Sequence, residues 1–279
     1  MARVPNEPAA YEQTVAAYQG VEDLDRFTPE ELSAYREGLL DRTAHQVAFL
    51  EARMQRRSRA LEVACGNGRL LLGLARSGTI AEGVGTDVAE SRIDFARAWT
   101  EDEQAGDTLQ FHVADALREE LPAEPFDAAL LITGALGYFE PMRAGSTADV
   151  LAAMRRALRP DGLLVLELYP HPRWRRMLDV TGGELRLWSE LPGDDPWRFY
   201  LSHLTLDDAG NLRHDKTFVH RTDGRIDDSR SEFLRLWSEP ELRGLLQATG
   251  FGDVAAFGDW AGRPYREGED ELLIVTASA

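Results

Sequence analysis

The sequence has little of several features that define other protein classes. It contains a single cysteine, Cys65, so an intramolecular disulfide cannot form. No apolar run approaches the roughly 20 residues that a helix needs to span a bilayer. The N-terminus lacks the apolar core of a secretory signal, and no residues have metal-ligand spacing. These absences predict a cytoplasmic protein with no membrane partner and no bound metal.

Basic residues are also scarce, which bears on the partner. The chain has 31 Lys and Arg against 48 Asp and Glu, a formal net charge of −17. Because phosphate contacts need a basic surface, this balance argues against a nucleic-acid partner. We expect a small-molecule substrate, and the acidity permits an amine without requiring one. The sequence leaves open whether the chain forms a homodimer.

The most informative stretch that is present runs from Leu61 to Arg69 and indicates a buried strand, a glycine turn and a helix. Gly66 and Gly68 let the backbone approach a ligand where a Cβ would collide. A second apolar segment ends in Asp87. A glycine turn after one strand and a carboxylate after the next is how a doubly wound sheet binds a nucleoside. An ordinary strand-to-helix turn is the alternative.

Leu71 helps to select the nucleoside. The dinucleotide fingerprint places a small residue at this position, where helix and strand pack beside a pyrophosphate. The leucine therefore favours an adenosine ligand without a diphosphate over a nicotinamide dinucleotide.

Apolar strand patterns alternate with helical patterns between residues 59 and 170, which predicts an α/β fold with a parallel sheet covered on both faces. The expected strands are 60–64, 82–86, 109–113, 127–132 and 163–168, and the expected helices are 69–76, 89–100 and 147–159. In such a sheet the ligand lies along the edge where the strands end.

Three further segments flank this core. Residues 1–58 are expected to be helical, with a helix that starts near Thr28 and Pro29. Residues 171–237 are rich in aromatic residues and turn signals, which predicts an inserted antiparallel sheet over the site, as a substrate lid. Residues 238–279 are expected to add a helix and the last two strands.

At these positions the chain resembles the class I S-adenosylmethionine (SAM) methyltransferases. Their first turn reads acid-x-G-C-G-x-G, which Glu62, Cys65, Gly66 and Gly68 match, with Ala64 in place of the usual first glycine. The resemblance implies a seven-stranded Rossmann-like sheet with an antiparallel terminal strand, and SAM as the cofactor, with S-adenosylhomocysteine as its product. An insertion at residues 171–237 is similar to that of glycine and amino-sugar N-methyltransferases.

The resemblance also implies where the cofactor binds. Asp87 matches the acid that binds ribose, Val88 the apolar residue beside adenine, and Asp115 with Ala116 the segment near the adenine amino group. The segment from Phe126 to Phe139, which includes Thr133, is similar to the fourth strand and the loop facing the methyl group. In family members the N-terminal segment often closes over the cofactor, so Tyr18 and Arg42 are candidates to reach it.

Candidates for the reaction itself follow the fourth and fifth strands. Tyr138 and Phe139 are expected as an aromatic wall near the sulfonium. Glu167 could orient an amine or accept its proton, and His171 is the candidate base by position and pKa range. Tyr169 and Trp174 are candidate substrate contacts. Each of these has ordinary packing or ion pairing as its alternative.

The sequence thus predicts a SAM-dependent methyltransferase of a small molecule, with a natural-product or amino-sugar amine as the expected acceptor. An amine with a lone pair needs little beyond positioning, whereas a hydroxyl or carbon acceptor needs a base. O- or C-methylation is the near alternative. A nicotinamide-dependent oxidoreductase on the same topology and a non-catalytic ligand-binding protein are the alternatives of other classes.

Overall fold

The computed structural model describes residues 7–122, 125–191, 193, 195, 197–207 and 210–279. Residues 1–6, on which part of the export prediction depends, lie outside this range. The elements in chain order are α1 (Glu7–Tyr18), a 3₁₀ turn (Leu24–Arg26), α2 (Pro29–Glu51), β1 (Ser58–Val63), α3 (Arg69–Arg76), β2 (Ile80–Asp87), α4 (Glu90–Asp102), β3 (Leu109–Val113), β4 (Phe126–Leu131), α5 (Leu136–Met142), α6 (Ser146–Ala157), β5 (Leu158–Leu168), α7 (His171–Val180), β6 (Glu184–Glu190), β7 (Trp197–Leu206), β8 (Asn211–His220), β9 (Ile226–Arg235), α8 (Glu239–Ala248), β10 (Gly252–Phe257) and β11 (Leu273–Ser278).

Seven strands form the central sheet, in the order β10-β11-β5-β4-β1-β2-β3. Neighbours among β1 to β5 pair in parallel, whereas β11 is antiparallel to both β5 and β10. The predicted fold class, including the terminal antiparallel strand, is therefore confirmed. Strand order reverses between β1 and β4, where parallel sheets of this kind bind ligands.

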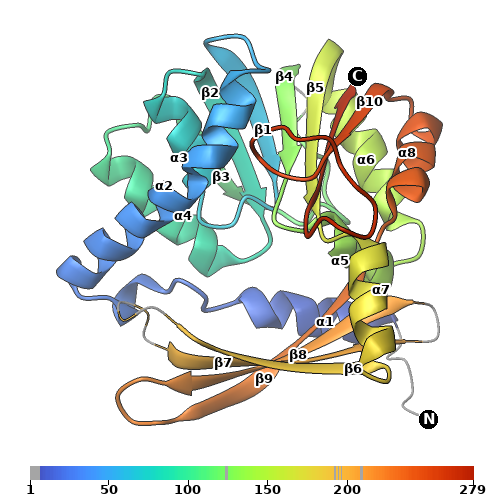
Figure 1. Ribbon diagram of the computed structural model, residues 1–279. Coiled ribbons are helices and arrows are strands. Elements are labelled where there is room, and N and C mark those ends of the chain that lie inside the picture. Colours follow the sequence, from blue (N-terminus) through green and yellow to red (C-terminus); the bar gives the residue numbers. More distant parts are fainter. Residues whose placement is uncertain (1–6, 123–124, 192, 194, 196, 208–209) are drawn as a thin grey trace.

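Helices cover both faces of the central sheet (Figure 1). Alternate residues of β4 show why: Ala129 and Leu131 pack with α6 and α8, while Ala128 and Leu130 pack with α2, α3 and α4. The two-residue period of a strand directs successive side chains to opposite faces. Both faces are apolar, so the strands are buried on both sides, as expected for a parallel sheet.

The second sheet, called here the small sheet, consists of β6 to β9 in sequence order and is antiparallel throughout. Figure 1 shows it below the central sheet, with α1 running between the two sheets. Helix α1 contacts both β9 and α5, so the N-terminal segment forms the layer that joins the sheets. The inserted antiparallel sheet predicted within residues 171–237 is present.

Two helices depart from the sequence-based expectation. Residues 136–139 were expected in a loop but belong to α5, a short helix that contains both Gly137 and Pro141. Residues 171–180 form α7 before the first strand of the insertion. Helix α1 lies within the N-terminal segment that was expected to be helical. Small and polar residues cover most of its surface, so no apolar stripe predicts its position within that segment. Within the described part of the chain, no helix is long and apolar enough to cross a membrane.

Candidate functional site

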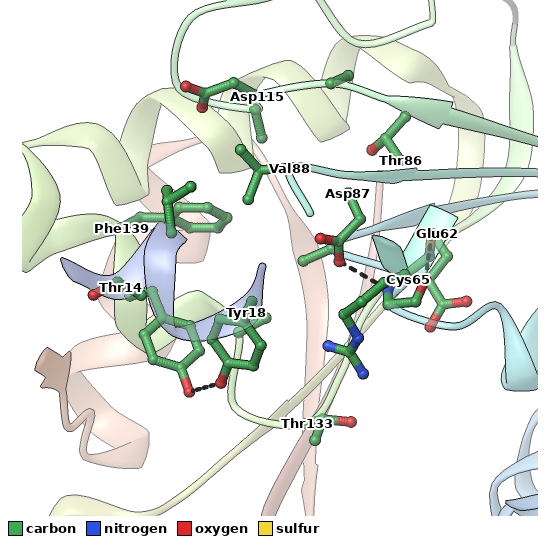
Figure 2. A pocket seen from close by; sticks show the side chains of 18 of the residues that line it. Thr14, Tyr18, Glu62, Cys65, Thr86, Asp87, Val88, Asp115, Thr133 and Phe139 are labelled. Carbon is green, nitrogen blue, oxygen red and sulfur yellow. Dashed lines mark hydrogen bonds between the residues drawn. The ribbon is translucent and has the colours of Figure 1, made fainter. Parts of the chain in front are cut away.

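A cavity of about 250 Å³ lies at the carboxyl edge of the central sheet, under α1 and α5. Figure 2 shows side chains from β1, β2, the β4–α5 connection and α1 converging on it. Eleven of the predicted site residues line it: Tyr18, Glu62, Ala64, Gly66, Asp87, Val88, Asp115, Ala116, Thr133, Tyr138 and Phe139. Residues that sequence reasoning missed also line it, among them Tyr11, Thr14, Arg69, Arg92 and Met142.

The turn after β1 is held in a left-handed backbone conformation. Gly66 has φ +56° and Gly68 has φ +74°, where a glycine is unstrained. A Cβ on Gly68 would lie 2.6 Å from the Phe111 ring, so this glycine serves close packing of the turn and does not line the cavity. Ala64 adopts φ +54°, which explains why the related family has glycine there.

Asp87 fixes the turn from the end of β2. Its Oδ2 accepts a hydrogen bond from the Gly66 amide at 2.8 Å, and its Oδ1 accepts one from the Ala89 amide at 2.9 Å. The side chain is 7% exposed and lines the cavity. A carboxylate has about four lone-pair sites, so Asp87 can accept further hydrogen bonds from a ligand.

Glu62 is a buried carboxyl group with an unmet hydrogen-bonding capacity. It is 2% exposed, and its Oε2 atom has no hydrogen-bond partner. Burial raises the pKa of Glu62 to about 8, although Arg69 acts in the opposite direction. A buried polar atom without a partner is costly, so Glu62 is suited to receive a donor or cation from a ligand in the cavity.

Asp115 lies at the end of the cavity opposite Glu62, as Figure 2 shows. It accepts a hydrogen bond at 2.7 Å from the phenol of Tyr11 and one from the Leu117 amide. Burial and the bond to Asp115 raise the pKa of Tyr11 to about 12. Helix α1 is therefore attached directly to the group that the sequence assigns to adenine.

Glu22 joins the segment after α1 to the glycine turn. Its carboxylate accepts hydrogen bonds from Arg92 Nε at 2.9 Å, from the Asn67 amide and from the Tyr35 phenol. The Arg92 guanidinium lies where a Gly66 side chain would be, since a Cβ there would lie 2.7 Å from it. Sequence reasoning missed this cluster because its members come from four separate segments.

The remaining wall is aromatic. Tyr18 of α1 and Tyr138 of α5 meet with their hydroxyl oxygens 2.7 Å apart, and both rings border the cavity with Phe139. Burial is the main cause that raises the pKa of both phenols well above the ordinary value. Both hydroxyls therefore stay un-ionised at neutral pH.

Six of the predicted site residues do not line the cavity. Besides Gly68, they include Glu167, whose Oε2 accepts a hydrogen bond from the Thr133 amide at 2.8 Å. Tyr169 and Trp174 pack against an apolar cluster of the small sheet. His171 borders a separate surface hollow beside α7, and Arg42 is exposed on α2. Burial raises the pKa of Glu167. Their predicted roles in cofactor binding and catalysis stay predictions.

Metal-binding chemistry is not evident in the described residues, where no group of three or more His, Cys, Asp or Glu side chains could hold an ion.

Comparison with known proteins identifies the core. Residues 60–162 match the family model described as a methyltransferase domain. This match assigns residues 60–162 to a methyltransferase domain. A demethylmenaquinone methyltransferase from Deinococcus radiodurans is 34% identical over 135 residues, which cover 48% of this chain and 52% of that protein. The chain thus spans about half the length of the curated relatives it matches.

Solved structures extend the likeness to nearly the whole chain, as a fold. The CcbJ methyltransferase from Streptomyces caelestis has a TM-score of 0.75 at 17% identity, over 96% of this chain and 98% of that one. A SAM-bound amino pentose methyltransferase from Micromonospora echinaspora has a TM-score of 0.61 at 21% identity, over 90% and 97%. The resemblance to class I methyltransferases is confirmed, and the nicotinamide alternative is set aside.

The methyltransferase domain's residues fit SAM as the cofactor. Gly66 of the turn and the Asp87 carboxylate line the cavity, and Glu62 supplies a buried oxygen without a partner. A nucleoside that also carries an ammonium group suits this combination of a free carboxyl oxygen and the Asp87 carboxylate.

Proposed function

We propose that the protein transfers the methyl group of SAM to the nitrogen of a small-molecule amine. The observation that carries the proposal is the pair of chemically different walls of one cavity. The wall formed by Glu62 and Asp87 carries two carboxyl groups beside the glycine turn, while the wall formed by Tyr18, Tyr138 and Phe139 is aromatic and un-ionised. The first wall suits a cofactor, and the second suits an acceptor.

Individual cofactor roles follow from position. Asp87 would accept hydrogen bonds from the ribose hydroxyls, Val88 and Ala116 would flank adenine, and Asp115 would receive its amino group. Glu62 would receive the ammonium of the methionine moiety. Arg69 interacts electrostatically with Glu62 and Glu167 and donates hydrogen bonds to Thr43 and Gln46. Its guanidinium would bind the carboxylate of the methionine moiety.

The cofactor supplies an electrophilic methyl group whose bond to sulfur breaks as the bond to the acceptor forms. The residues of the chain would hold the acceptor in line and exclude water, which can supply up to about 7–11 kcal/mol of the barrier. Aromatic rings near a sulfonium also stabilise its positive charge. No histidine is among the residues that line the described cavity, and its three acidic residues, Glu62, Asp87 and Asp115, are assigned to the cofactor above. This favours an amine, because a hydroxyl or carbon acceptor would need a base.

A small acceptor, not a nucleic acid, is supported by the net charge of −17. One protein of similar fold is named an amino pentose methyltransferase, and an amino sugar of natural-product type is the kind of acceptor we infer here. The four segments of the sequence would then serve as N-terminal closure, SAM-binding core, substrate lid and C-terminal completion of the core. The cytoplasmic location stays a prediction, and the sequence leaves a homodimer open.

Incubation of the protein with SAM and a panel of amino sugars, amino acids and other small amines tests the proposal. Mass spectrometry should detect a gain of one methylene on at least one amine, together with an equal amount of S-adenosylhomocysteine. The Asp87→Ala variant is the matched control and should produce neither. Tight binding of SAM without methylation of any amine, while hydroxyl or carbon acceptors react, would contradict the nitrogen assignment. Tight binding with no acceptor at all would favour the non-catalytic alternative.

A further inference from the structure

A carboxylate of the small sheet is buried beside the aromatic wall. Glu232 of β9 is 2% exposed, which is rare for a glutamate unless its charge is paired. Its Oε1 atom pairs with the ammonium of Lys216 on the neighbouring strand β8. Its Oε2 atom accepts a hydrogen bond from the phenol of Tyr138 at 3.0 Å. Neither Glu232 nor Lys216 lines the cavity, so both would act through other residues.

The Tyr138 phenol continues this chain of hydrogen bonds to the cavity. Its oxygen lies 2.7 Å from the oxygen of Tyr18, and both tyrosines border the cavity. The chain of hydrogen bonds therefore runs from Glu232 of the small sheet through Tyr138 of α5 to Tyr18 of α1. Glu232 accepts the hydrogen bond from Tyr138 and raises the pKa of both phenols, so it is a group that can polarise the pair.

The carboxylate determines the direction of these hydrogen bonds. An ionised carboxylate only accepts, so Tyr138 must donate its proton to Glu232. The Tyr138 oxygen then accepts from Tyr18, whose single proton is thereby used. The Tyr18 oxygen is left with lone pairs and no proton to offer, so it can only accept a hydrogen bond from a molecule in the cavity.

Charge at the two phenols supports this arrangement. The nearby Glu232 carboxylate adds to burial in raising the pKa of Tyr18 and Tyr138. The acceptor molecule would therefore meet a neutral, oriented hydroxyl oxygen and not a phenolate. Lys216 and Arg92 also lie 5.8 and 5.6 Å from the Tyr18 ring centre, where their positive charges act against that of Glu232.

We propose that Glu232 is a positioning residue that orients the Tyr18–Tyr138 pair so that the cavity presents a hydrogen-bond acceptor to an N–H group of the methyl acceptor. The proposal rests on the methyl transfer proposed above and narrows its substrate class. The favoured acceptor is a primary or secondary amine, which retains an N–H to donate, and not a tertiary amine.

The test uses two cofactor analogues, so it does not require the acceptor to be known. Sinefungin carries an amine-bearing carbon where SAM has its methylsulfonium, whereas S-adenosylhomocysteine has a thioether there and no donor. Calorimetry on the full chain should find that sinefungin binds about tenfold or more tightly than S-adenosylhomocysteine, the gain expected of a hydrogen bond that involves a charged group.

Glu232→Gln should remove this preference and leave the affinity for S-adenosylhomocysteine within about twofold. The reason is Lys216, whose ammonium attracts the amide oxygen of the new side chain and turns its NH₂ group toward Tyr138. That reverses the chain of hydrogen bonds, so Tyr18 would then donate into the cavity. The double change Glu232→Gln and Lys216→Met frees the amide to turn, and the preference for sinefungin should return.

Tyr138→Phe gives a second route to the same result, should Glu232→Gln fail to fold, because it interrupts the chain directly. Tyr200→Phe is the control, since this phenol lies on the same sheet but bonds to His214 outside the cavity. An unchanged preference in a folded Glu232→Gln or Tyr138→Phe variant would overturn the proposal. Loss of affinity for both analogues in equal measure would assign Glu232 a structural role and also overturn it. Wild-type protein that binds neither analogue would instead refute the proposed function.

Discussion

The two sheets of this protein bring polar side chains to the site in different ways. In the central sheet, parallel strands end at one edge, so Glu62 of β1 and Asp87 of β2 meet there because of topology alone. In the small sheet the strands are antiparallel, and the buried Glu232 lies within β9, away from a strand end. Its partner Tyr138 comes from α5, so the proposed acceptor half of the site, the wall of Tyr18, Tyr138 and Phe139, depends on tertiary contacts.

The largest expected effect tests the central-sheet half of this comparison. Asp87→Ala removes two hydrogen bonds to backbone amides and the proposed ribose contact. We expect affinity for S-adenosylhomocysteine to fall about a hundredfold, because each charge-assisted bond contributes about 1.5–3 kcal/mol. Calorimetry measures this, with Asp87→Asn as the isosteric control that should lose less. Equal affinity in wild type and Asp87→Ala would show that the ribose lies elsewhere.

A second test concerns protonation of the same wall. The pKa of Glu62 is raised to about 8 by burial, so the free protein holds this carboxyl protonated at neutral pH. A cationic ligand favours the ionised form, so SAM binding should release a proton. The affinity for SAM should therefore rise by up to about tenfold for each unit by which the pH is raised toward 8. Calorimetry in buffers of different ionisation enthalpy counts the proton.

The Glu62→Gln variant provides the control, because it should abolish the proton release. The same shift acts on stability with a definite sign. A carboxyl whose pKa is raised on folding stabilises the free protein fully below its unfolded value of 4.5, and this contribution is lost as pH rises toward 8. A pH-independent SAM affinity with no released proton would mean that Glu62 does not face the ammonium.

A third and smaller effect concerns backbone strain in the turn. Ala64 has φ +54°, which costs an alanine about 1 kcal/mol relative to glycine. Ala64→Gly should therefore raise the melting temperature by about 2–4 °C. Gly68→Ala is the opposite control and should destabilise, because its Cβ would lie 2.6 Å from Phe111. Thermal unfolding followed by circular dichroism compares the two, and a lower melting temperature for Ala64→Gly would contradict the assignment of strain.

The smallest expected effect is on the outer face of the small sheet. Trp188 is 69% exposed and contacts mainly the Phe199 ring, 5.7 Å away between centroids. Trp188→Ser should change the free energy of unfolding by less than about 1 kcal/mol and leave cofactor affinity unchanged. Urea denaturation and calorimetry check both quantities. A large loss of cofactor affinity would mean that the outer face is coupled to the site, contrary to the comparison drawn here.

The sequence predicted the central sheet well because its signals are local. Strand runs, the glycine turn at Gly66 and the acid at Asp87 each lie within a few residues of the feature they indicate. Helix α5 was missed because Gly137 and Pro141 disfavour helices in isolation, and packing against β9 and α1 overrides that preference.

The acceptor half of the site could be predicted only in part. Tyr18, Tyr138 and Phe139 were identified and do line the cavity, but Glu232 and Lys216 have no sequence signal that separates them from surface residues. Their pairing depends on the register of β8 and β9 and on contact with α5, which a single sequence does not encode locally. His171 shows the converse: it lies close in sequence to the fifth strand, yet α7 carries it to a separate hollow.

A crystal structure of the complex with S-adenosylhomocysteine tests the central claim most directly. We predict that the ribose hydroxyls lie within hydrogen-bonding distance of the Asp87 carboxylate and that the sulfur faces the Tyr18–Tyr138 wall. Density for the ligand outside this cavity, or its absence at saturating concentration, would contradict the account.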